Sequence, residues 1–214
     1  HYCATLVRLS PELRQSYTRN LIDILTIRTG NPSQGLRFVQ LLMNTLPDFE
    51  SALIDAVLIP FAQQHAESLS LSASCDVLNF LKGEAARNWL GSALAPKLRD
   101  YPAVKQFTPD TAMFAAHRLL NGVPFDDASR PAPADRARYA REVVAPMFLD
   151  AVAAQKIGHT KVPEWIHLIL KAQDSRENRA EAERILGVAY RQTHFNRQFM
   201  AVAGPAIPAI GYVW

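Results

Sequence analysis

The sequence predicts an all-α fold, an irregular bundle of about nine or ten helices. Apolar residues recur at helical spacing in one segment after another, whereas no segment shows the sustained alternation of a half-buried strand. Proline and glycine stand where helices begin and end. Helix lengths vary and no fixed repeat period is visible, which disfavours a regular solenoid. We therefore predict a single helical domain over residues 1–214.

The first two helices have the clearest boundary signals. For a helix over residues 11–29, Ser10 is a typical N-cap, Pro11 suits the first helical position, and Gly30 follows the end. The second helix, residues 35–46, follows a similar Asn-Pro pair. Both segments carry apolar residues at intervals of three and four, as expected for helices that bury one face.

The third and fourth helices are predicted with less regular ends. The third covers residues 48–59, and Pro60 is expected to kink it or end it, because proline cannot donate a helical hydrogen bond. The fourth covers residues 74–82 and has two candidate caps, Ser72 and Ser74.

The central helices follow the same rules. A helix over residues 84–99 contains Trp89, which we expect in the core because its neighbouring leucines fall on nearly the same side. The next helix, residues 109–120, has Thr108 as its predicted cap and Gly122 as its stop. The boundaries carry errors of about two to four residues.

The last three helices follow the one clear linker-like loop of the sequence, "GVPFDDASRPAPADR". Its aspartates, Asp126 and Asp127, are expected to face water. The helices after it cover residues 134–157, which include an internal proline, residues 163–173, and residues 178–202. Met113 and Phe114 of the helix before this loop, and Met147 and Phe148 after it, are predicted core residues.

Composition limits the classes of function. With 49% hydrophobic and 20% charged residues the chain is typical of soluble globular proteins. The net charge of +3 comes from 23 basic and 20 acidic residues, too even a balance to indicate nucleic acid. Cys3 and Cys75 form no disulfide framework, which favours a reducing, cytoplasmic compartment. The apolar C-terminal residues 199–214 contain prolines and are too short for a transmembrane segment.

No motif predicts an enzyme, a metal site or a cofactor. The sequence has no glycine-rich phosphate loop, no paired metalloprotease histidines and no glycine-flanked serine elbow. Cys75 beside Asp76 is interpreted as a quiet, half-buried thiol. The histidines are separated from one another and are interpreted as structural or surface residues; they are His1, His65, His117, His159, His167 and His194. A hydrolase with an unrecognised nucleophile stays open as a weaker alternative.

One stretch carries a more specific pattern, "NFLKGEAARNWLGSALAPKL" at residues 79–98. Together with residues 20–46, "MFLDAV", "KVPEWIHLIL" and "ILGVAYRQTHFNRQF", it resembles the Ras-GTPase-activating-protein-related domain of IQGAP scaffold proteins. The matching residues of the main stretch are Phe80, Lys82, Gly83, Asn88, Leu90, Leu94, Ala95 and Pro96. The resemblance covers most of the chain but only the first two-thirds of the family domain, as a fragment of a longer domain would.

The resemblance implies binding of a Rho-type or Ras-type small GTPase in its GTP form, as part of a scaffold or regulator, without faster hydrolysis. Activating proteins of this class insert an arginine beside the GTP phosphates. The matching position lies near Ser68, and residues 63–80 contain no arginine or lysine. The second arginine of the family aligns with Thr193. If any hydrolysis were accelerated, Arg87 or Arg191 would be the candidate finger.

The implied partner-binding residues are Ser68, Lys82, Arg87, Arg191, Asn196 and Arg197. Lys82 and Arg87 either lie on a solvated helix face or rim a docking surface for an acidic partner. On an ideal helix they point about 140° apart, so only the turn at Gly83 would bring them together. The alternative function is a helical adaptor, or a secreted bacterial effector, that binds another protein.

Overall fold

The structure is a computed structural model that describes residues 10–45 and 54–193 of the 214 residues. The residues it describes form nine continuous helical stretches and no strand, which confirms the all-α prediction. Contacts divide the chain into two compact units, residues 1–80 and 81–214, and each is described by itself. The single domain over the whole chain stays a prediction.

The first unit begins with a helical hairpin whose ends follow the sequence signals. Helix α2 (Pro11–Thr29) is capped by Ser10, whose Oγ accepts from the Leu13 N–H, and it stops at Gly30 as predicted. Helix α3 (Pro32–Thr45) packs against α2 and begins three residues earlier than predicted. The reason is the Asn-Pro pair before it, in which the Asn31 side chain accepts from the Ser33 N–H and Pro32 starts the helix.

The third helical stretch continues through Pro60, so the predicted end at residue 59 is wrong. A π-helical turn (Ile54–Leu58) leads directly into α5 (Ile59–Gln64). Pro60 leaves the Ala56 carbonyl without its helical donor, and the Arg19 guanidinium donates to that oxygen at 2.7 Å instead. The start of this predicted helix, residues 48–53, lies outside the described residues.

The last helix of the first unit, α6 (Leu71–Val77), begins and ends earlier than predicted. Its cap is Ser70, whose Oγ accepts from the Ala73 N–H at 3.2 Å, and neither Ser72 nor Ser74 has this role. The Ser70 N–H in turn donates to the Ser33 hydroxyl of α3, against which α6 packs. This tertiary bond selects one serine from a serine-rich segment.

The second unit contains two long helical stretches with an internal proline each. The first comprises α7 (Gly83–Trp89), a π-helical turn (Leu90–Leu94) and α8 (Ala95–Asp100). The other comprises α10 (Pro133–Tyr139), a second π-helical turn (Ala140–Val144) and α11 (Ala145–Ala153). In both, the residue four positions before the proline lies in the middle of the π-helical turn. The wider turn moves that carbonyl away from the proline ring.

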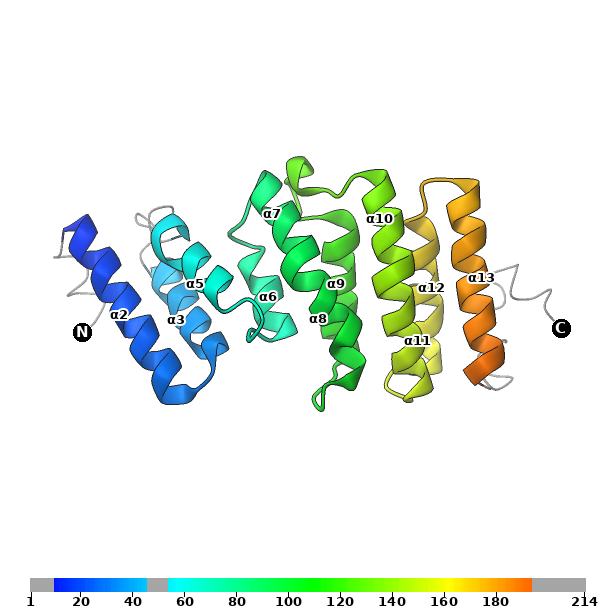
Figure 1. Ribbon diagram of the computed structural model, residues 1–214, viewed down its shortest axis with the longest axis horizontal. Helices are drawn as coiled ribbons and strands as arrows, with labels where there is room; N and C mark the ends of the chain where they lie inside the picture. Colours follow the sequence, from blue (N-terminus) through cyan, green and yellow to red (C-terminus); the bar gives the residue numbers. More distant parts are fainter. Residues whose placement is uncertain (1–9, 46–53, 194–214) are drawn as a thin grey trace. The chain divides into compact units, whose positions relative to one another are not determined.

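Three further helices complete this unit in two layers. The stretches α7–α8 and α10–α11 lie beside α13 (Arg176–Thr193) in one layer, and α9 (Pro109–Asn121) and α12 (Val162–Lys171) form the layer behind them (Figure 1). Each helix runs against the direction of the one before it. The predicted helix over 178–202 begins at Arg176, and its residues beyond 193 lie outside the described part.

Two helix ends in this unit differ from the predictions. Helix α11 stops at Ala153, before the predicted end at 157, because Gln155 takes the left-handed conformation (φ 57°) and the Lys156 N–H bonds back to the Ala151 carbonyl. Thr108 is the N-cap residue of α9 as predicted, but its side chain makes no capping hydrogen bond to the helix. Its hydroxyl donates to the Thr111 hydroxyl instead.

The core of the second unit lies between the two layers. Trp89 is buried as predicted, and so are Met147 and Phe148. Phe148 of α11 stacks on Trp165 of α12, with ring centroids 5.8 Å apart. The prediction for Phe114 is wrong, because its side chain is 45% exposed.

We expect Phe148→Ala to lower the free energy of unfolding by about 3–5 kcal/mol, because it leaves a cavity against Trp165. The control is Phe125→Ala, at a fully exposed phenylalanine, with an expected change below about 0.5 kcal/mol. Denaturant titration followed by tryptophan fluorescence reports this unit, since all three tryptophans belong to it. Equal losses in the two variants would contradict the described core.

Candidate functional site

A groove lined by more basic than acidic side chains lies along the layer of the second unit that α9 and α12 form. It consists of three hollows of about 560, 670 and 320 Å³. The three meet at His117 of α9. The first lies at the C-terminal end of α9, and the other two lie between α9 and α12. We call the three together the α9–α12 groove.

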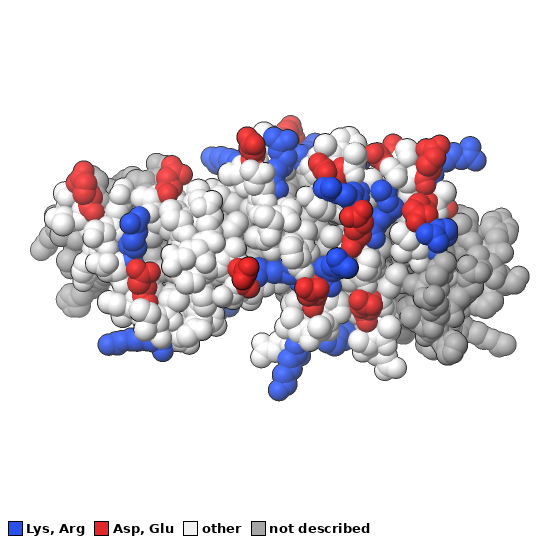
Figure 2. All heavy atoms as spheres, viewed as in Figure 1, with Lys and Arg blue, Asp and Glu red and all other residues white. Residues whose placement is uncertain are grey.

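The side chains that line the groove include five cations and two carboxylates. The cations are Arg118, Arg130, Arg136, Lys161 and Lys171, and the carboxylates are Asp110 and Glu164. Lys161 Nζ lies 3.5 Å from Glu164 Oε2, so one carboxylate is already paired within the groove. By contrast, blue and red side chains are interspersed on the face of this unit drawn in Figure 2. The groove therefore concentrates positive charge in a chain with a net charge of only +3.

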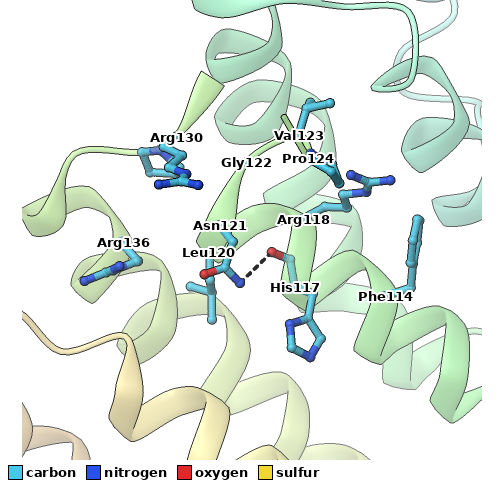
Figure 3. Close-up of a pocket in the computed structure, with 11 residues that line it drawn as sticks. Phe114, His117, Arg118, Leu120, Asn121, Gly122, Val123, Pro124, Arg130 and Arg136 are labelled. Atoms are coloured by element: carbon cyan, nitrogen blue, oxygen red, sulfur yellow. Dashed lines mark hydrogen bonds between the residues drawn. The ribbon is translucent and has the colours of Figure 1, made fainter. Parts of the chain in front are cut away.

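The first hollow collects three arginines from three different elements (Figure 3). Arg118 comes from α9, Arg130 from the loop after it, and Arg136 from α10. Arg130 and Arg136 lie on one side of Asn121 and Arg118 lies on the other (Figure 3). The side-chain amide of Asn121 donates to the His117 carbonyl at 3.1 Å. No acidic residue is among the described residues that line this hollow. We call it the arginine hollow.

The three guanidinium groups have different surroundings. Arg118 lies over the Phe114 ring, 4.8 Å from its centroid. Arg130 pairs with Asp127 at 3.0 Å, but both side chains are largely exposed, so the pair contributes little. Nε of Arg136 is buried and finds no hydrogen-bond partner among the described residues. A buried donor without a partner is costly, so this guanidinium is not fully satisfied by the described structure.

The loop between α9 and α10 is held in one shape by its own hydrogen bonds. The buried Ser129 hydroxyl accepts from the Val123 N–H at 2.8 Å and donates to the Asp126 carbonyl at 2.7 Å. One Asp126 carboxylate oxygen accepts from the Gly83 N–H at 2.7 Å, which ties the loop to the start of α7. Asp126 is therefore half-buried, contrary to the prediction, whereas Asp127 faces water.

Of the residues predicted to bind a partner, the three that the structure describes (Ser68, Lys82 and Arg87) do not line this groove. Lys82 and Arg87 are exposed at and just after the start of α7, and neither forms an ion pair within residues 10–45 and 54–193. Ser68 lies in an exposed turn of the first unit. Arg191 belongs to α13, but its side chain is outside the described part, as are Asn196 and Arg197 altogether.

Sequence reasoning missed the arginine hollow because it treated the loop as a linker. The available signal was the placement of Arg118, Arg130 and Arg136 around a short, proline-rich segment. His117 and His167, far apart in the sequence, both line the second hollow. No group of three or more metal-ligating side chains is found among the described residues. Cys75, in the first unit, forms no disulfide within the described residues and is more deeply buried than predicted.

Comparison of the chain with models of protein families, with curated proteins and with solved structures finds no match. Among the helices in the described ranges, none is both long enough and apolar enough to cross a bilayer. The proposed function therefore rests on the groove and its charges.

We expect Gly122→Ala to destabilise the second unit by about 2–4 kcal/mol. Gly122 has φ 77° and ψ −162°, a region almost restricted to glycine. An added Cβ would also lie 2.8 Å from Ser129 Oγ and 3.0 Å from the Arg130 backbone. The control is Gly83→Ala, which has φ 53° but only an ordinary contact at 3.8 Å, so about 1 kcal/mol is expected. A smaller loss for Gly122→Ala than for the control would contradict the described loop; denaturant titration measures both.

Proposed function

We propose that the chain is a protein-binding module that holds an acidic segment of another protein in the α9–α12 groove. The observation that carries the proposal is the groove's lining of five cations against two carboxylates. A cationic groove attracts acidic segments over several ångströms and raises their association rate. This is the adaptor function that the sequence left as an alternative, now assigned to a surface.

The dimensions of the groove suit a short stretch of polypeptide. Helix α9 has 13 residues, so the groove beside it is about 20 Å long. An extended segment of about six residues spans that length. The lining also offers apolar contacts, including Leu120, Leu168 and Ala172. Apolar contacts would supply affinity, and the cations would supply the preference for an acidic sequence.

A small GTPase in its GTP form is the partner that the resemblance proposes. The acidic effector surface of such a protein would meet Lys82 and Arg87 at the start of α7. Two observations support this proposal: both side chains are exposed, and within the described ranges neither is neutralised by a carboxylate. The surface around Lys82 and Arg87 and the α9–α12 groove belong to the same unit. Reversing charges on one surface at a time separates their contributions to binding.

For the groove, we expect Lys171→Glu to weaken capture of acidic peptides about two- to thirtyfold, which corresponds to about 0.5–2 kcal/mol. The probe is a degenerate peptide library with acidic residues at alternating positions, compared with a basic library of the same design. Lys105→Glu, an exposed lysine outside the groove, is the matched control. Equal capture of the two libraries by the unmutated protein would sink the proposal.

For the GTPase proposal, we expect Lys82→Glu and Arg87→Glu to weaken binding of a GTP-loaded partner by about 0.5–2 kcal/mol, to make it less salt-sensitive and to leave the melting temperature unchanged. The measurement titrates Cdc42-type, Rac-type and Ras-type proteins, loaded with a non-hydrolysable GTP analogue or GDP, at two salt concentrations. No binding in either nucleotide state would leave the acidic-segment proposal alone.

The same proteins, loaded with GTP, test whether hydrolysis is accelerated. We expect no acceleration, since residues 63–80 contain no arginine or lysine to serve as a finger. The assay is single-turnover hydrolysis with and without the chain. A rate increase of about a hundredfold would point to another arginine, and Arg87→Ala would then identify or exclude the exposed candidate on α7.

A further inference from the structure

We infer that the arginine hollow is a binding site for a phosphate monoester, carried on a side chain of the segment bound in the α9–α12 groove. The inference rests on the proposed function and specifies the chemistry at one end of the groove. Its first support is composition, because three arginines line the hollow and none of its described lining residues is acidic. Figure 3 shows Arg130 and Arg136 on one side of Asn121 and Arg118 on the other, so a group that enters the hollow would have cations on two sides.

The second support is the state of the guanidinium groups. Arg136 lines the hollow, and its guanidinium forms no ion pair within the described residues. Within the part of the chain that the structure describes, Arg130 pairs with the exposed Asp127 alone, a weak pair that a stronger anion would replace. Arg118 is oriented by its position over Phe114, which itself lines the hollow.

The third support is the match of charge and shape. A phosphate monoester carries a charge of about −1.5 to −2 at neutral pH and three acceptor oxygens, so it can accept from several planar guanidinium forks. A carboxylate has a single charge and two oxygens, which satisfies one arginine well but not three. Apolar walls from Leu120, Val123 and Pro124 exclude part of the water and strengthen these interactions.

The size and continuity of the hollow favour a phosphorylated side chain over a free anion. A volume of about 560 Å³ leaves room for flanking polypeptide beside the phosphate. The hollow also shares His117, Leu120, Asn121 and Arg136 with the second hollow between α9 and α12. A segment whose phosphate lies among the arginines can therefore continue along the groove.

The first experiment uses inorganic phosphate as the probe at constant ionic strength. We expect saturable shifts of backbone amide NMR signals over residues 117–136 and at least a tenfold loss of affinity in Arg136→Gln. Arg138→Gln is the matched control, because Arg138 lies on the same helix but pairs with Asp135 and lines none of the hollows. Unperturbed signals in this region, or equal affinity in Arg136→Gln and Arg138→Gln, would overturn the inference. Circular dichroism checks that both variants fold, and Arg136→Lys, which keeps the charge, should retain part of the affinity if Arg136→Gln does not fold.

The second experiment identifies the source of the phosphate. Degenerate libraries with a fixed phosphoserine or a fixed serine are offered to the unmutated protein, alongside phosphatidylcholine vesicles with and without phosphatidic acid. We expect enrichment of phosphoserine peptides that Arg136→Gln abolishes. Equal capture of both libraries would leave the acidic-segment proposal standing and overturn the phosphate site. Phosphate binding without capture of any peptide would overturn both the proposed function and the inference that the phosphate is carried on a bound segment. Arg136-dependent binding to the acidic vesicles alone would assign the phosphate to a lipid and overturn the peptide source.

Discussion

The architecture depends on helices that continue through a proline. Proline in a helix removes one hydrogen bond, and its ring collides with the carbonyl four residues before it. Three described stretches accommodate Pro60, Pro96 and Pro146 by a π-helical turn directly upstream. In the first unit, the Arg19 guanidinium then satisfies the displaced Ala56 carbonyl. The proline thus leaves a backbone carbonyl that accepts a hydrogen bond from a neighbouring side chain. The chain keeps one long helix where it would otherwise have two short ones.

The two π-helical turns of the second unit also lie where its layers meet. The turn at Leu90–Leu94 packs against α9, and the turn at Ala140–Val144 packs against α12 and α8. Helix α9 faces this contact with small side chains, among them Ala112, Ala115 and Ala116, which allow its backbone to come close. Its opposite side is then left with Phe114, His117 and Asn121. The groove is thus a consequence of the way α9 packs against the π-helical turn.

The sequence predicts features that depend on neighbouring residues and misses those that depend on distant ones. Ser10 and Gly30 are sufficient to place the two ends of α2, because capping residues act within a few residues of a helix end. The cap of α6 was missed because Ser70 is selected by a bond from its backbone to Ser33, 37 residues earlier. The early end of α11 was missed because Gln155 takes a conformation usual for glycine. The groove requires residues 109–136 to meet residues 161–172, which no local pattern encodes.

The loop between α9 and α10 connects the two surfaces proposed for partners. Arg130 lines the arginine hollow, and Asp126 of the same loop holds the Gly83 N–H beside Lys82. Replacing a residue of this loop would therefore disturb the start of α7 as well as the hollow, and a loss of binding would not identify the surface responsible. Arg136 and Lys171 lie outside the loop, and no hydrogen bond within the described residues depends on their side chains. Changing their charge alters the field in the groove while the hydrogen bonds that shape it stay in place, so these two positions separate recognition from folding.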